Sequence, residues 1–344
     1  MSYPSYLRWL LNETKTTWWH DSADPAELDR GLERGAIGVT TNPFLSSVAL
    51  LKNRQSWAPE IEAVLARKLD PEPKAEALMR IAVTKAAAKL MPEHERTGGQ
   101  SGFVCAQVNP SRAGDRDSML PMAQRFHAWA PNIAVKLPAT SAGLDVLEEC
   151  VAQGITVTAT VSFTVPQVVW IAERHRRGIA RAKAAGINAG KCFAVVMIGR
   201  LDDYLREVAH DRQVAVTEAD IRQAGISATK RAYAIYKDKH YEAVLLVAAL
   251  RGTHHLTELA GADLIMSIHP AFQDPFLAPD LAYEQRIDLQ VPPDVIGRLS
   301  QMPEFTRAYE PDGMSPGDFV TYGATQRTLC QFVEAGWRLI ENLQ

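Results

Sequence analysis

Cysteine is scarce in this chain, with four residues among 344. No two cysteines form a C-x-x-C pair, and no histidine lies near one at zinc-ligand spacing. This scatter predicts reduced thiols in a cytoplasmic protein, and it disfavours a disulfide framework or a zinc site. The four residues are Cys105, Cys150, Cys192 and Cys330.

An excess of one charge and long apolar runs are also missing. Lys plus Arg number 37 and Asp plus Glu number 40, which gives a formal net charge of −3. This balance disfavours a general nucleic-acid binder, because such proteins need a basic excess. Polar residues and Pro166 interrupt the most apolar stretch, 151–171, so we expect no membrane span. Residues 1–12 lack the basic segment and apolar run of a signal peptide.

Alternation is what the chain has in abundance. Short runs rich in β-branched residues precede longer segments of helical spacing, which is typical of βαβ units. The pattern predicts one α/β domain over 1–344, a (β/α)8 TIM barrel with its core at about 16–275. We expect extra helices at the N-terminus and a C-terminal extension at about 280–344. A doubly wound sheet is the alternative, but no Gly-rich dinucleotide turn follows the first strand. The expected strands are 16–22, 38–41, 103–109, 133–137, 156–162, 192–198, 243–250 and 264–268, and the expected helices include 25–34, 72–90, 115–129, 142–152 and 166–185.

Each of the eight expected strands ends in polar side chains. In barrels of this type the loops after the strands form the open, catalytic face. A solvated rim explains a few such residues, but eight sets that converge on one rim favour a polar pocket. In chain order they are Asp21, Thr40 to Asn42, Gln107 with Asn109, Lys136, Thr158 with Thr160, Arg200, Arg251, and Ser267 with His269.

Lys136 is the most informative of these residues, because it lies within the otherwise apolar run IAVKLP at 133–138. An unpaired buried ammonium is costly. Such a lysine therefore pairs with a carboxylate, extends its head to the surface, or loses its proton and becomes nucleophilic. A neutral amine is what Schiff-base chemistry on a carbonyl substrate requires.

Asp21 follows two tryptophans and His20 at the end of the first expected strand. A carboxylate beside large aromatic rings suits a general acid or base. Its alternative role is to cap the helix near Pro25, which Ser22 or Asp24 could also do. His20 faces the opposite side of the strand, so we interpret it as a packed histidine.

Two arginines end the sixth and seventh expected strands, where barrel enzymes commonly bind phosphate. The planar forks of Arg200 and Arg251 suit that ligand, and ordinary rim salt bridges are the alternative. His254 and His255 are neighbours in sequence and point in different directions. We therefore interpret them as surface or capping residues and not as metal ligands.

Four segments form a recognisable set: GVTTNP at 38–43, VKLPAT at 135–140 with Gly143-Leu144, Gly154-Ile155 with Thr160, Phe163 and Gln167, and IGR at 198–200 with Asp202-Asp203-Tyr204. Together they resemble the transaldolase family. Their order and spacing hold from about Asp21 to the C-terminal helix. The resemblance implies an aldolase-type barrel without metal or organic cofactor, acting on sugar phosphates in the pentose phosphate pathway.

The resemblance also implies a role for each site residue. Lys136 would form the imine with a ketose, and Asp21 would exchange the proton of the hydroxyl on carbon 4. Thr160 would hold the water that moves protons. Substrate-binding roles would fall to Thr41, Asn42, Asn109, Thr158, Arg200, Arg251 and Ser267.

Several positions depart from the family pattern. Gln107 replaces a glutamate and can only orient the water, as in the related fructose 6-phosphate aldolases. Those aldolases carry a tyrosine where this chain has Met197. Ala249 replaces a phosphate-binding serine, and Thr158 replaces an asparagine. With these changes, a sulfonated sugar or a specialised biosynthetic sugar is an alternative substrate.

The sequence therefore favours transfer of a dihydroxyacetone unit from a ketose to an aldose. The alternatives are a lyase that releases free dihydroxyacetone, which Gln107 favours, and a sugar-phosphate-binding homologue without turnover. Met197 and the C-terminal extension favour the transferase. An apolar stripe at 327–343 covers the chain's own barrel, which we favour, or forms a homodimer contact. The Pro-rich segment 291–318 is expected to be a loop over the barrel mouth or a connection.

Overall fold

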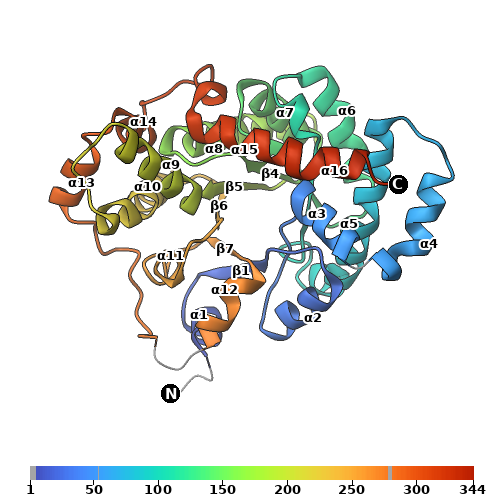
Figure 1. The fold of residues 1–344 in the computed structure, drawn as a ribbon, viewed down its shortest axis with the longest axis horizontal. Coiled ribbons are helices and arrows are strands. Elements are labelled where there is room, and N and C mark those ends of the chain that lie inside the picture. Colours follow the sequence, from blue (N-terminus) through green and yellow to red (C-terminus); the bar gives the residue numbers. More distant parts are fainter. Residues whose placement is uncertain (1–4, 53, 278–280) are drawn as a thin grey trace.

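A parallel sheet forms the centre of the molecule, and helices lie around it (Figure 1). The computed structural model describes residues 5–52, 54–277 and 281–344. Its seven strands follow the order β1-β7-β6-β5-β4-β3-β2. They are β1 (Thr17–His20), β2 (Val104–Gln107), β3 (Ile133–Pro138), β4 (Val157–Thr160), β5 (Cys192–Met197), β6 (Val244–Ala248) and β7 (Ile265–Ile268).

The strand expected at 38–41 is not confirmed as a full strand. Only Val39 forms bridges there, one to His20 of β1 and one to Val104 of β2, both parallel. Backbone bonds of 2.9 Å support these bridges, from Thr40 N–H to His20 O and from Cys105 N–H to Val39 O. The segment is short because the chain enters helix α3 (Pro43–Lys52) directly after Asn42. The α/β class is confirmed, with seven strands and one bridging residue between the two edge strands.

Helices follow the strands much as the periodicity predicts. The five expected helices are present, with ends displaced by at most six residues. In the first half of the chain the helices are α1 (Tyr6–Glu13), α2 (Pro25–Glu33), α3, α4 (Arg54–Leu65), α5 (Pro71–Arg96), η1 (Pro110–Arg112), α6 (Arg116–His127), α7 (Ser141–Ala152) and α8 (Val165–Ala184). In the second half they are α9 (Ile198–Asp211), α10 (Glu218–Asp238), α11 (Thr253–Thr257), α12 (Pro270–Gln273), η2 (Asp274–Leu277), α13 (Pro293–Leu299), α14 (Pro303–Tyr309), η3 (Phe319–Thr321), α15 (Gly323–Phe332), η4 (Val333–Trp337) and α16 (Arg338–Glu341).

Four consecutive strands of the sheet are buried along their whole length. Every residue of β2, β3, β4 and β5 is buried. Parallel strands that are covered on both faces read as nearly continuous apolar runs. The polar residues that interrupt these runs are therefore conspicuous, and β3 carries the lysine of the predicted site.

The C-terminal part of the chain packs on the chain itself. Elements α15, η4 and α16 contact α3, α5 and α9, so the apolar stripe covers its own fold, as we favoured. The segment 291–318 is no unstructured loop, because α13 and α14 form there and pack on α10. Prolines at 293 and 303 begin these two helices at the position where a proline costs no hydrogen bond. Residue 280, where the expected extension starts, lies outside the described residues.

All four cysteines are free thiols, as expected. Burial raises the pKa of Cys105 and raises that of Cys150 to about 12. In the part of the chain that the structure describes, no helix combines the length and apolar character needed to span a bilayer.

Candidate active site

A hollow of about 240 Å³ lies at the carboxyl ends of the strands. Six of the eleven predicted site residues line it: Asp21, Asn42, Lys136, Arg200, Arg251 and Ser267. The other five are Thr41, Gln107, Asn109, Thr158 and Thr160, which lie on the same strands or on the loops after β2 and before α3. Parallel strands therefore bring together residues that are up to 246 positions apart in sequence.

Lys136 lies at the bottom of this hollow with a side chain that is 5% exposed. Its Nζ donates a 3.1 Å hydrogen bond to the backbone carbonyl of Thr41. No carboxylate of the described residues lies within 4.0 Å of it. Two of the three readings of this lysine, the ion pair and the surface-seeking head, therefore do not hold. An amine that opens onto a hollow without an acidic partner can attack a carbonyl.

The position of Lys136 depends on how tightly β3 joins α7. Thr140 caps α7, because its Oγ1 accepts from the N–H of Gly143 at 3.1 Å. A Cβ at position 143 would lie 1.9 Å from the carbonyl oxygen of Pro138. Only glycine permits that approach, so Gly143 fixes the end of the strand that carries the lysine.

Two buried oxygen atoms close to Lys136 have no partner among the described residues. They are Oε1 of Gln107 and Oγ1 of Thr160. Gln107 is the register partner of Lys136 in the sheet, and Thr160 is the register partner of Pro138. A buried polar atom without a hydrogen bond is destabilising, so a folded protein keeps one where water or a ligand supplies the bond.

Asp21 is held at the rim by a hydroxyl chain. Thr40 Oγ1 donates to Asp21 Oδ1 at 2.6 Å and lies 2.5 Å from Ser267 Oγ. The alternative role of Asp21 as a helix cap is not used, because Asp24 Oδ1 accepts from the first N–H groups of α2. Asp21 therefore keeps one carboxylate oxygen for chemistry in the hollow. Thr40 was noted only as a polar strand end, and its role in holding Asp21 emerges from the structure.

The remaining predicted binding residues serve mainly structural contacts. Asn42 Oδ1 accepts from Leu45 N–H at 2.9 Å and so caps α3. The hydroxyl of Thr41 donates to the Cys105 carbonyl at 2.7 Å. Asn109 Nδ2 donates to Glu72 at 2.6 Å, away from the hollow. Thr158 is wholly buried in the same layer as Lys136 and lies 3.4 Å from Cys105 Sγ.

The two arginines differ in how many of their donors are used. Arg251 donates to Asp203 at 2.6 and 2.9 Å and to the carbonyls of Ala249 and Leu250. Arg200 donates to Gln331 at 2.7 Å, and its buried Nε has no partner among the described residues. Burial and the nearby Arg251 lower the pKa of Arg200. Arg200 thus keeps the freer donors for an anionic group.

His255 is wholly buried, so its interpretation as a surface or capping residue is wrong. Its Nδ1 accepts from the backbone N–H of Arg251 at 3.1 Å, and its Nε2 lies 2.9 Å from Asp202 Oδ2. The first bond fixes the proton on Nε2, which then donates to Asp202. Asp202, His254 and His255 lie close enough to suggest a metal, but this tautomer leaves His255 no lone pair for a cation. The cluster is a hydrogen-bonded support for the loop that carries Arg251.

Two strand ends next to the hollow have left-handed backbone at residues with side chains. These are Val161 after β4, with φ of 56°, and Ala249 after β6, with φ of 59°. Each costs about 1–2 kcal/mol, and such residues concentrate at functional sites. A Cβ at Gly199 would lie 2.4 Å from the Ala249 carbonyl oxygen, so glycine there admits the first turn of α9.

Sequence reasoning missed the side chains that helices contribute to the lining of the hollow. Gln331 and Phe332 come from α15, and Arg200 lies 5.5 Å over the Phe332 ring. Phe44 of α3 and Phe272 of α12 also line the hollow. Nothing in the sequence links α15 to a strand end more than 130 residues earlier. The apolar stripe at 327–343 indicated that one face of this segment is buried, but it did not indicate which part of the fold this face packs against.

Comparison with known proteins agrees with this geometry. The family model described as transaldolase/fructose-6-phosphate aldolase matches residues 18–302. A transaldolase of Neisseria gonorrhoeae is 34% identical over 202 residues, which cover 58% of this chain and 57% of that protein. Transaldolase 1 of Streptomyces avermitilis is 27% identical over 334 residues, which cover 92% of this chain and 82% of that protein.

The match to the Neisseria relatives spans little more than half of their length, whereas the family model covers most of this chain. The fold and the site define an α/β protein with a buried lysine that, within the described part of the chain, has no carboxylate partner in its hollow. The chain belongs to the transaldolase/fructose-6-phosphate aldolase family.

Proposed function

We propose that this chain transfers a dihydroxyacetone unit from a ketose phosphate to an aldose through a Schiff base on Lys136. The observation that carries the proposal is the buried Lys136 amine, which lines the hollow without a carboxylate partner. Asp21 lines the same hollow and is held by Thr40. The names of the relatives support transfer, and the same site geometry suits either member of the family. We also interpret the sheet as a (β/α)8 barrel in which 37–40 is a shortened strand.

The proposed reaction begins when Lys136 Nζ attacks the carbonyl at carbon 2. Loss of water gives a protonated imine. This imine is itself the electron sink of the reaction, so the proposed mechanism needs no metal or organic cofactor for that purpose. Gln107 and Thr160, whose buried oxygens have no partner in the part of the chain that the structure describes, hold the water that carries protons in this step. Their positions beside Lys136 in the sheet fit this role.

Carbon–carbon cleavage follows from the imine. The Asp21 carboxylate takes the proton of the hydroxyl on carbon 4, the bond between carbons 3 and 4 breaks, and its electron pair moves into the imine. The aldose leaves and a three-carbon enamine stays on Lys136. The enamine then attacks the acceptor aldehyde, Asp21 returns the proton to the new hydroxyl, and water releases the ketose. Arg200 binds the terminal anionic group, with Arg251 held beside it by Asp203.

The lyase that releases free dihydroxyacetone is the second candidate, and Gln107 is the observation that favours it. Incubation with fructose 6-phosphate, with and without erythrose 4-phosphate, separates the two. A transferase forms a seven-carbon ketose phosphate only when both sugars are present. Free dihydroxyacetone released at the same rate without the acceptor would establish the lyase instead. A cytoplasmic location and a homodimer stay predictions.

A further inference from the structure

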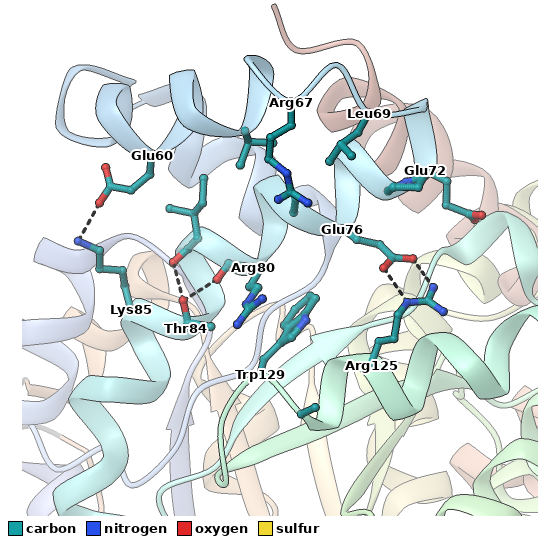
Figure 2. Close-up of a pocket in the computed structure, with 15 residues that line it drawn as sticks. Glu60, Arg67, Leu69, Glu72, Glu76, Arg80, Thr84, Lys85, Arg125 and Trp129 are labelled. Atoms are coloured by element: carbon teal, nitrogen blue, oxygen red, sulfur yellow. Dashed lines mark hydrogen bonds and ion pairs between the residues drawn. The ribbon is translucent and has the colours of Figure 1, made fainter.

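A second and larger hollow lies on the flank of the molecule, between α4, α5 and the end of α6 (Figure 2). Its volume is about 960 Å³, against 240 Å³ for the candidate active site. None of the predicted site residues lines it. We propose that this hollow binds a nucleotide, with its phosphates on Arg67 and Arg80 and its base on Trp129.

The charges in this hollow are unequal. Each of its three carboxylates faces a cation: Glu60 lies 3.0 Å from Lys85, Glu76 lies 2.7 Å from Arg125, and Glu72 lies 3.1 Å from Arg112. Arg67 and Arg80 have no carboxylate within 4.0 Å in the described part of the chain. Two positive charges are therefore uncompensated in one concave surface.

Both free guanidinium groups lie in this hollow. Figure 2 shows Arg67 entering the hollow from the turn after α4, while Arg80 extends from α5 toward Trp129. A single exposed arginine is usually just solvated. Two forks that point into the same hollow can both donate to one phosphate or diphosphate, the geometry that arginine favours for such groups.

Part of the lining of the hollow is aromatic and apolar, and a bare anion would not contact these side chains favourably. One face of Trp129 stacks on the buried Phe126, with ring centroids 4.0 Å apart and planes at 28°. Trp129 itself is half-buried and lines the hollow, where Figure 2 shows its ring beside Arg80. Val64, Leu69 and Ile81 line the same hollow. A planar base can stack on such a ring, and together with the arginines this selects an aromatic ligand that carries phosphate.

Calorimetric titration of the intact protein with ADP tests the proposal, with adenosine and inorganic phosphate as component probes. We expect saturable ADP binding that is at least about tenfold tighter than that of either component. The double variant Arg67→Gln/Arg80→Gln should weaken ADP binding at least about tenfold, because it removes the charge-assisted bonds. Trp129→Leu should weaken ADP and adenosine and leave phosphate unchanged.

Two controls keep this test separate from the proposed catalysis. Arg177→Gln removes an exposed arginine on α8 that also lacks a carboxylate within 4.0 Å among the described residues, and it should bind ADP like the wild type. Lys136→Met should also bind ADP normally, whether or not the Schiff-base proposal holds. Absence of saturable ADP binding, equal weakening by Arg177→Gln, or equal affinity for ADP and phosphate would each overturn the nucleotide site.

Discussion

The candidate active site has two halves, one around Lys136 and one around Arg251, which differ in how many of their polar atoms form hydrogen bonds within the protein. Around Lys136, the amine has one bond to a carbonyl, and the Gln107 and Thr160 oxygens have no partner among the described residues. Around Arg251, the guanidinium binds Asp203 and two carbonyls, and His255 uses both ring nitrogens. Both halves are built from strand ends of the same sheet.

We interpret this difference as a division between groups that react with the substrate and groups that keep the site in shape. A buried polar atom without a bond costs about 1–3 kcal/mol, so a fold keeps one where a ligand completes it. A fully bonded cluster is instead rigid and has nothing left to offer a substrate. The Lys136 half is therefore the reacting half, and the Asp202–His255 half is its support.

The largest effect should come from the reacting half. Lys136→Met removes the nucleophile and keeps the length of the side chain. We expect turnover to fall by at least about 10⁴-fold, because no other group in the hollow can form the imine. Steady-state assays with fructose 6-phosphate and erythrose 4-phosphate measure this loss.

A control for this variant is Lys230→Met. Lys230 is also buried, but it donates to two backbone carbonyls and Glu258. The midpoint of thermal unfolding should fall for Lys230→Met and stay the same or rise for Lys136→Met. Retained turnover in Lys136→Met would remove the distinction between the two halves.

Asp21→Asn should have the next largest effect. The amide cannot take the hydroxyl proton, so we expect turnover to fall by about 10²–10⁴-fold. Imine formation on Lys136 should persist, since it does not need that proton transfer. Rapid-quench detection of the imine separates the two steps. Thr40→Val should show a smaller loss, because it only frees Asp21 from a hydrogen bond; a larger loss than Asp21→Asn would contradict the assigned roles.

Acid should act on a fully packed histidine outside the reacting half. His20 accepts from Gln273 Nε2 at 2.9 Å through Nδ1, and burial lowers its pKa to about 4. The unfolded chain takes up this proton near pH 6.5, whereas the folded chain does so only near pH 4. The neutral histidine therefore adds stability that is full above about pH 6.5 and is lost as pH falls toward 4, on the order of 3 kcal/mol.

Thermal unfolding between pH 4 and 7 tests this dependence. His20→Gln should flatten the curve in that window, whereas His210→Gln, at an exposed position, should leave it unchanged. A curve for His20→Gln that is as steep as that of the wild type would assign the acid sensitivity to other groups.

A pair of threonines gives the smallest but sharpest comparison. The buried hydroxyl of Thr160 has no partner among the residues that the structure describes, whereas Thr41 donates to the Cys105 carbonyl. Thr160→Val should slow turnover about tenfold at unchanged or raised stability, and Thr41→Val should lower the free energy of unfolding by about 1 kcal/mol. Urea denaturation measures the stability of both variants, and steady-state assays measure their turnover. An equal loss of stability in the two variants would mean that Thr160 is bonded within the protein.

Much of the fold followed from local patterns. Seven of eight expected strands form. The eighth, at 38–41, failed because strand pattern and helix cap compete for the same residues, and Asn42 caps α3. The Pro-rich segment 291–318 concealed two short helices, since proline at the first helical position resembles a loop signal in sequence.

The candidate site was predictable as far as strand ends define it. Lys136, Asp21 and Arg200 all line the hollow. The contributions of Gln331 and Phe332 were not predictable, because they depend on where α15 docks. The burial of His255 was hidden for a similar reason: its partner Asp202 lies 53 residues earlier, and no periodicity joins them.

Reduction of the trapped imine tests the central claim most directly. The protein is incubated with fructose 6-phosphate and borohydride, and the adduct is mapped by peptide mass spectrometry. The account predicts a three-carbon adduct on Lys136 in the wild type, a six-carbon adduct on Lys136 in Asp21→Asn, where the imine forms but cleavage stops, and no adduct in Lys136→Met. An adduct on another lysine, or turnover without any adduct, would contradict it.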